Sequence, residues 1–164
     1  MKVDFKGYFR VARENPTTND WATADVFVNM IDLFLRGEAP GIGTISVGLN
    51  PQFVSAGQVL AGGGPTQGSE CRIAVAAQFE MPGMSVLLNK EPILLMNNSI
   101  KSLPPVEDPN GAAHIYNLPL YDSKNPNGRP VAYLRSLKYT VGNYITETEA
   151  KAFREAGEKA FGKR

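Results

Sequence analysis

Residues 20–36 constrain the fold of this chain more than any other segment. Four polar residues recur there at intervals of four, three and four positions, namely Asp25, Asn29, Asp32 and Arg36. On an α-helix these intervals place all four side chains on one narrow stripe, whereas a regular strand would divide them between its two faces. Nearly all the other positions are apolar or small, so the helix would contact water along one edge only. The pattern therefore predicts a helix over residues 20–36 that the rest of the chain wraps.

The residues that flank this segment support a helix at both ends. Residues 18–20 offer N-cap oxygens, and Gly37 stands where a left-handed C-terminal residue is wanted. Wrapping would bury the large apolar side chains of the helix. We therefore expect Phe27, Ile31 and Phe34 to lie in the core.

Most of the remaining chain has strand character, with apolar alternation between turns rich in Pro, Gly and Asn. The expected strands cover residues 2–12, 41–49, 52–60, 71–81, 85–89, 92–98, 112–121 and 131–145. Lys90 and Glu91 separate two of these segments and predict the tip of a hairpin.

The C-terminal segment has the signature of a surface helix. Thr146 and Glu149 have the spacing of a capping box, and the apolar side of residues 147–161 includes Phe153 and Phe161. We therefore predict an α+β fold with a single domain over residues 1–164. In this fold one mostly antiparallel, curled sheet of about six to eight short strands surrounds the buried N-terminal helix, and the C-terminal amphipathic helix lies outside.

Composition narrows the classes of function. The chain has 17 Lys and Arg against 16 Asp and Glu among its 164 residues, a net charge of +1, so no global field favours nucleic acid or an anionic membrane. Its one cysteine, Cys71, has no internal disulfide partner, and the N-terminal sequence lacks a signal-peptide pattern. No apolar run approaches the ~18 residues of a membrane-spanning helix. We expect a protein that is cytoplasmic or assembled inside a cell.

Metal and cofactor sites are not expected. One His and one Cys leave few ligands for a transition metal. The glycine-rich residues 62–68 lack the Lys-Ser/Thr end of a phosphate-binding loop, and no helical pattern follows them.

Four residues are candidates for catalysis if the chain is an enzyme. Asp32 lies on the predicted buried helix, where a carboxylate must be paired, hydrated or shifted in pKa. It lies either on the single solvent-facing edge of that helix or beside a cavity as an acid or base. The second interpretation places His114, Tyr116 or Tyr121 opposite it.

A small basic and aromatic patch is the candidate for nucleic-acid binding. Arg129, Tyr133, Arg135 and Tyr139 interleave charged and aromatic side chains on one predicted strand, as platforms for single-stranded nucleic acid do. Nucleic acid is an unlikely partner on this pattern, because the patch is small.

Residues 39–69 contain no Asp, Glu, Lys, Arg or His. Charge depletion is typical of the centre of a subunit interface, although inner strands of a core would also explain it. We therefore predict a non-enzymatic, self-associating structural or assembly subunit, such as a component of a virus-like particle, that forms a homo-oligomer through residues 39–69. The alternative is a small-molecule enzyme or binding protein with a pocket between helix 20–36 and the sheet. A nucleic-acid-binding module is the third interpretation.

Overall fold

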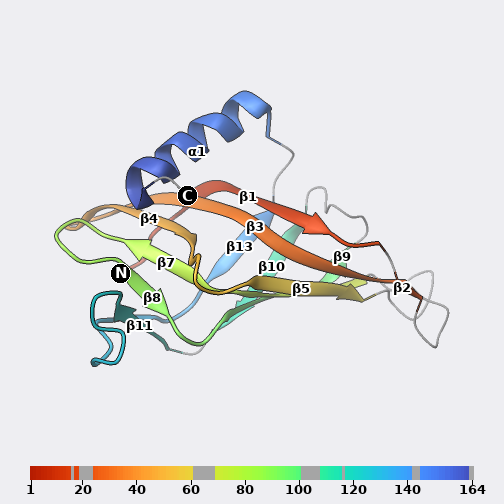
Figure 1. Cartoon of the computed structure of the whole chain (residues 1–164), viewed down its shortest axis with the longest axis horizontal. Coiled ribbons are helices and arrows are strands. Elements are labelled where there is room, and N and C mark those ends of the chain that lie inside the picture. The colour runs from red at the N-terminus through yellow and green to blue at the C-terminus, as the bar shows by residue number, and fades with distance from the viewer. Residues whose placement is uncertain are drawn as a thin grey trace.

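The fold is built mainly from antiparallel strands. A computed structural model of the chain describes residues 1–15, 17–18, 24–60, 69–100, 108–115, 117–141 and 145–162. Its strands are β1 (Lys6–Arg13), β2 (Thr17–Thr18), β3 (Ala24–Ala39), β4 (Gly43–Leu49), β5 (Ser55–Leu60), β6 (Ser69–Val75), β7 (Ala77–Glu80), β8 (Leu87–Asn89), β9 (Ile93–Ile100), β10 (Asp108–His114), β11 (Leu118–Asp122), β12 (Ala132–Leu134) and β13 (Lys138–Val141). The helix α1 (Glu147–Phe161) follows them and lies across β1, β3 and β4 (Figure 1).

The sheet is a meander in which most rows consist of two strand segments placed end to end. Along one edge β3 pairs with β1. Along the other edge its residues 34–39 pair with β4 and its residues 26–30 pair with β5. The later rows continue this division, so the sheet has two arms that both start at β3. The first arm is β4-β7-β8-β11-β12 and the second arm is β5-β6-β9-β10-β13.

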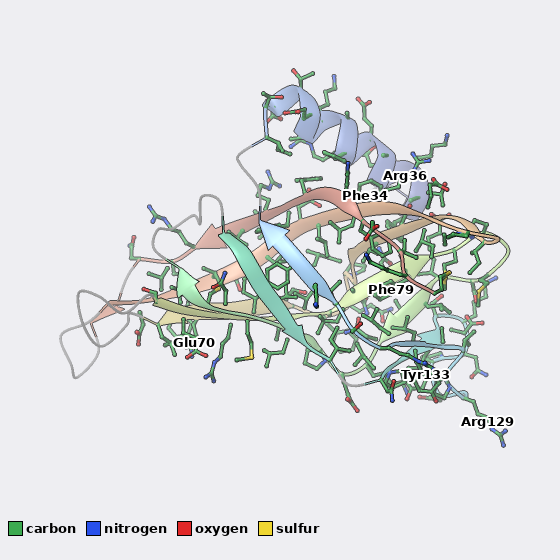
Figure 2. The ribbon with its side chains drawn as sticks, turned by 180° about the vertical axis from the view of Figure 1, so that it is seen from behind. Phe34, Arg36, Glu70, Phe79, Arg129 and Tyr133 are labelled. Atoms are coloured by element: carbon green, nitrogen blue, oxygen red, sulfur yellow. The ribbon has the colours of Figure 1, made fainter. Side chains whose placement is uncertain are left out.

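The two arms share one apolar core. It combines buried side chains of β3, of the first arm and of the second arm. From β3 come Val26, Val28 and Met30; from the first arm Val47, Leu49, Ala77, Phe79, Leu87, Leu118 and Leu120; and from the second arm Val59, Ile73, Val75 and Ile93. Figure 2 shows Phe79 between the upper and lower strands, while Phe34 lies directly beneath α1. The arms therefore pack against each other through their inner faces.

The predicted helix over residues 20–36 is wrong, because the described part of this segment, from Ala24, belongs to the long strand β3. A β-bulge explains the misleading pattern. Arg10 of β1 pairs with Asp32 and Val11 pairs with Met30, which leaves Ile31 as an extra residue in β3. One extra residue reverses the alternation of the strand. The polar residues at positions 25, 29, 32 and 36 therefore share one face of a bulged strand, as they would share one face of a helix.

The outer face of β3 is only partly covered. Phe27 is 46% exposed and Ile31 is 48% exposed, so the prediction that they lie in the core is wrong. Phe34 is buried as predicted, but it is covered by α1 rather than by a surrounding sheet. The inner face of β3 holds the core residues instead.

The overall fold prediction is accordingly wrong in its central element, since the sheet surrounds no N-terminal helix. The antiparallel pairing and the C-terminal helix are confirmed. Thr146 accepts from the amide of Glu149, and the Glu149 carboxylate accepts from the amide of Thr146, so the capping box is present. The predicted hairpin at Lys90 and Glu91 is wrong, because β8 and β9 do not pair with each other but lie end to end in one row.

Deleting Ile31 tests the bulge. The deletion would restore a regular strand and turn one half of β3 inside out, so we expect the free energy of unfolding to fall by more than about 3 kcal/mol, the cost of losing one large buried side chain. Urea unfolding followed by circular dichroism measures the change. The control is Ile31→Ala, which keeps the extra residue and should cost less than about 1 kcal/mol at a half-exposed site. Equal midpoints for the deletion and the wild type would show that the bulge does not set the register.

Candidate functional site

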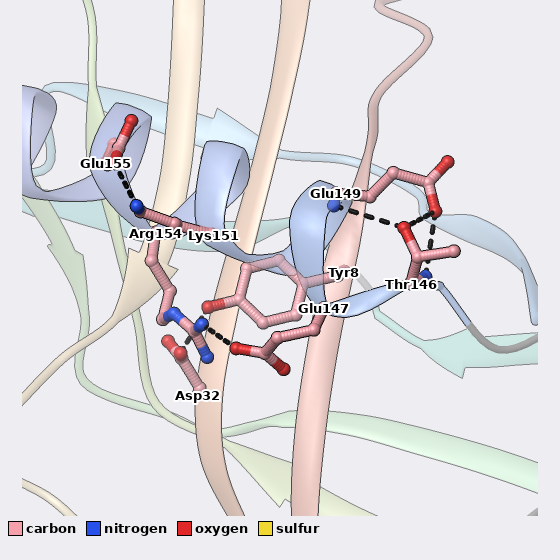
Figure 3. Close-up of polar contacts among 8 residues, drawn as sticks. All are labelled: Tyr8, Asp32, Thr146, Glu147, Glu149, Lys151, Arg154 and Glu155. Atoms are coloured by element: carbon pink, nitrogen blue, oxygen red, sulfur yellow. Dashed lines mark hydrogen bonds and ion pairs between the residues drawn. The ribbon is translucent and has the colours of Figure 1, made fainter.

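A buried tyrosine and a carboxylate meet on the outer face of β1 and β3. Tyr8 lies opposite Phe34 in the pairing of these strands, and its side chain is buried. The Tyr8 hydroxyl donates a hydrogen bond to Oδ2 of Asp32, as Figure 3 shows. The bulge at Ile31 turns Asp32 and Phe34 to the outer face, opposite the core residues Val28 and Met30 of the same strand.

The helix α1 covers this pair. The ring of Phe153 stacks on Tyr8 with 5.6 Å between the ring centroids, and lies 6.4 Å from the ring of Phe34. Gly157 packs so closely that a Cβ atom there would lie 3.2 Å from the Phe34 ring. The helix thus docks through aromatic contacts and one close approach at a glycine.

Charged groups of α1 complete the cluster. The guanidinium of Arg154 donates to the Glu147 carboxylate (Figure 3). This hydrogen bond lowers the pKa of Glu147 and raises the pKa of Arg154, whose positive charge also faces Tyr8 and Asp32. The cluster therefore contains two acids, one base and one phenol from three elements.

The electrostatics of Tyr8 point to a structural role for this cluster. Burial raises the pKa of the Tyr8 hydroxyl, and the hydrogen bond to Asp32 and the charge of that carboxylate raise the pKa further. The phenol therefore stays protonated and acts as a fixed donor. A phenol held in this state is a poor base or nucleophile. The ring contacts of Phe153 with Tyr8 and Phe34 fasten α1 to the sheet.

A second polar group lies where the rows of the sheet are broken. Ser55 Oγ accepts from the amide of Ala76 at 2.9 Å and donates to the carbonyl of the same residue at 3.4 Å. Asn89 Oδ1 accepts from the amide of Ala77 at 2.7 Å, while its Nδ2 donates to the carbonyls of Val75 at 3.2 Å and Glu91 at 2.7 Å. Both side chains are buried and take the place of missing sheet hydrogen bonds.

Asn50 is the third buried polar side chain at this level. It follows β4, its amide donates to the carbonyl of Ala76 at 2.9 Å, and its Oδ1 accepts from the amide of Gln52 at 3.0 Å. Its Nδ2 has no hydrogen-bond partner in the described part of the chain. A buried donor without a partner costs about 1 to 3 kcal/mol.

The predicted catalytic residues that the structure describes lie on three different strands. Asp32 lies in β3 and accepts a hydrogen bond from Tyr8 of β1. Tyr121 lies in β11, and Lys90 Nζ lies 4.4 Å from the centroid of its ring. His114 ends β10, and Tyr116 lies outside the described residues. In the sheet, β10 is the fourth strand from β3 in the second arm, and β11 is the fourth strand from β3 in the first arm. Each of them lies about 19 Å from β3, measured along the sheet.

The predicted nucleic-acid patch is divided between the arms. Tyr139 lies in β13 of the second arm and donates to the carbonyl of Met96 at 3.0 Å. Tyr133 lies in β12 of the first arm and is 57% exposed, and Arg129 and Arg135 are exposed near it. Figure 2 shows Arg129 and Tyr133 at the rim of the molecule. Three of the four residues thus remain as a surface group.

Sequence reasoning missed the residues that carry most of the buried polar contacts. Tyr8 was part of an expected strand, and residue 50 was expected only to form a turn before Pro51. No local signal identifies Ser55 or Asn89, because their partners come from other rows. Within the described residues, no three His, Cys, Asp or Glu side chains are grouped as metal ligands. The helix of the described chain is too short and too polar to cross a membrane.

These features define a class of antiparallel β-sheet protein with a shared apolar interior, a few buried amide and hydroxyl groups at the strand breaks, and a docked terminal helix. The chain belongs to the family of unknown function DUF6073, whose model matches residues 1–151. Among solved structures it is similar to DynF from the dynemicin biosynthesis pathway of Micromonospora chersina. The two chains are 41% identical, with a TM-score of 0.80, over 89% of this chain and 72% of that chain. A comparison with curated proteins gave no match.

This likeness corrects the first functional prediction. A structural or assembly role is not supported, because the similar protein comes from a biosynthetic pathway. The comparison favours the alternative, a small-molecule enzyme or binding protein. The predicted location of its pocket also needs correction, because residues 24–36 form a strand and not a helix.

The pH dependence of stability tests the position of Tyr8. Because its folded pKa is raised, the protonated phenol stabilises the folded state fully below about pH 10, and this contribution is lost as pH rises above that value. We expect the wild type to lose stability above about pH 10 relative to Tyr8→Phe, by at most about 1.4 kcal/mol per pH unit. Urea unfolding from pH 8 to about pH 11.5 measures the difference.

The matched control is Tyr133→Phe, at an exposed tyrosine. This variant should follow the wild type at every pH. Parallel profiles for the wild type and both variants would contradict the buried position of the Tyr8 hydroxyl.

Proposed function

We propose that this protein binds a small molecule in a biosynthetic pathway, as an enzyme or as a binding protein that holds a pathway intermediate. The observation that carries the proposal is the likeness to DynF, a protein of the dynemicin biosynthesis pathway, at 41% identity over most of both chains. Identity at this level over a shared fold makes a related role a reasonable expectation, although fold alone would not.

The interior between the two arms is the proposed binding region. Small-molecule sites are usually lined by apolar side chains with a small number of polar groups. The inner faces of the arms have this composition, with the core side chains around Phe79 and Leu87 and the buried amides of Asn50 and Asn89. The cluster at Tyr8 lies on the opposite face of β3 and is filled by α1, so it is the weaker candidate.

The proposed role fits a place inside the producing cell. The thiol of Cys71 is free, and burial raises its pKa to about 11, so it is held as the unreactive protonated form.

Recovery of a bound compound tests this function. The full chain is purified without denaturation from its own producing cells, extracted with organic solvent and analysed by liquid chromatography and mass spectrometry. We expect one compound that is absent when the same protein is unfolded in urea and refolded before extraction. Failure to recover any compound enriched in the native sample would contradict the proposal.

A pair of variants tests the location. Ala77→Leu adds volume to the inner face and should reduce the recovered compound at least several-fold, whereas Ala74→Leu makes the same change on the outer face of β6 and should leave it unchanged. Overpacking costs about 1 to 3 kcal/mol, so circular dichroism must confirm that both variants are folded. Equal recovery from the two variants would place the ligand outside the interior.

A further inference from the structure

Asn50 carries a hydrogen-bond donor that the described chain does not use. The residue is 2% exposed, and its Nδ2 has no hydrogen-bond partner among the described residues. Its Oδ1 is occupied, since it accepts from the amide of Gln52 at 3.0 Å. The oxygen of this side-chain amide is therefore held in place, while its nitrogen is buried without a hydrogen-bond partner.

Rotating the amide by half a turn does not remove the available donor. The rotation would point the Nδ2 hydrogens at the amide hydrogen of Gln52, so two donors would face each other. The contact with Gln52 thus determines which atom of Asn50 is left without a partner. The unpaired nitrogen follows from the hydrogen-bond chemistry of the turn after β4.

The neighbouring polar side chains have no such unpaired donor. Ser55 and Asn89 lie at the same breaks of the sheet, and both use their donors and acceptors on backbone groups of the adjacent row. Asn50 Nδ2 is the one buried side-chain nitrogen or oxygen without a partner in the portion of the chain that the structure describes. Because buried polar groups are nearly always paired, this donor indicates an acceptor from outside the chain.

The surroundings restrict the chemistry of that acceptor. The buried polar residues of the described chain are Ser46, Asn50, Ser55, Asn89 and Asn97, and none of them is charged. A carboxylate or phosphate beside Asn50 would thus be a buried charge without a described buried counterion, which is strongly unfavourable. An uncharged carbonyl or hydroxyl oxygen meets the same donor without that cost.

We propose that Asn50 is a ligand-binding residue whose Nδ2 donates a hydrogen bond to an uncharged carbonyl or hydroxyl oxygen of a small molecule. This inference rests on the proposed function and adds to it the class of ligand and the residue that orients it. The bulk of the ligand contacts the apolar inner faces of the arms, and the single oxygen sets its direction.

Three probes of one shape test the assignment: indane, 1-indanone and indane-1-carboxylate. They are titrated into the ¹⁵N-labelled full chain and followed by NMR. We expect 1-indanone to bind roughly tenfold more tightly than indane, as one buried hydrogen bond predicts, and the carboxylate to bind more weakly than the ketone. The side-chain NH₂ signal of Asn50, assigned by its loss in Asn50→Asp, should shift with the ketone only.

Two variants at Asn50 separate the donor from the turn. Asn50→Asp and Asn50→Ser both keep an oxygen that can accept from Gln52, but neither has Nδ2. In both, the preference for 1-indanone over indane should fall below about twofold. Asn50→Ser decides the result if the buried charge of Asn50→Asp prevents folding, as circular dichroism would show. The control is Asn127→Ser in an exposed loop, which should bind all probes as the wild type does.

Several results would overturn the proposal. These are equal affinity of the wild type for indane and 1-indanone, an unchanged preference in both Asn50 variants, binding of none of the three probes, or an ordered water on Nδ2 in crystal structures with and without the ketone. Probe binding that ignores Asn50 would leave the proposed function in place. The proposed function fails separately, when solvent extraction recovers no compound from the native protein.

Discussion

One extra residue in β3 sets the architecture of this protein. A regular strand of that length would direct Val28 and Leu33 to opposite faces, and only half of it could face a common core. The bulge at Ile31 reverses the alternation, so Val28 lies in the core and Leu33 packs against it. The same reversal gathers Asp32 and Phe34 on the outer face, where Tyr8 and α1 cover them. The core and the docking site of the helix thus depend on one local irregularity.

The strand breaks beyond β3 are a second consequence of the division into arms. A break exposes backbone groups that a continuous ladder would have paired, and burial makes each unpaired group costly. Ser55 and Asn89 satisfy these backbone groups with side-chain hydrogen bonds to residues 75–77 and 91. The side chain of Asn50 is itself only partly hydrogen-bonded, because its oxygen closes a turn while its nitrogen has no partner in the described chain. The breaks are therefore where the interior departs from a purely apolar composition.

Local patterns predicted most elements of the fold, and tertiary pairing decided the rest. The strands β1 and β4 to β13 lie within or next to segments with strand character, and Thr146 with Glu149 predicted the start of α1. The segment from Asp25 to Arg36 misled because its intervals suit both a helix and a bulged strand, and only the pairing with β1 distinguishes them. Its β-branched and aromatic residues favour a strand, but the spacing of its polar residues excludes a strand only if the alternation is regular.

The candidate site was harder to predict, for the same reason. Asp32 stands out in the sequence as a polar group on a mostly apolar segment, but its partner Tyr8 comes from a strand that only the register identifies. The free nitrogen of Asn50 depends on how residues 50–53 turn and on the neighbouring row at Ala76. Spacing along the sequence carries no information about such contacts.

The extent of the family match separates the two polar regions. The match to DUF6073 covers residues 1–151 and ends within the first turns of α1, so Phe153, Arg154 and Gly157 lie beyond it. These are the residues that dock the helix on Tyr8 and Phe34. The arms and their breaks, including Asn50, lie entirely within the matched region. The interior in which the ligand site is proposed thus lies within the region shared with the family, whereas the helix docks on the outer face of the bulged strand through residues beyond that region.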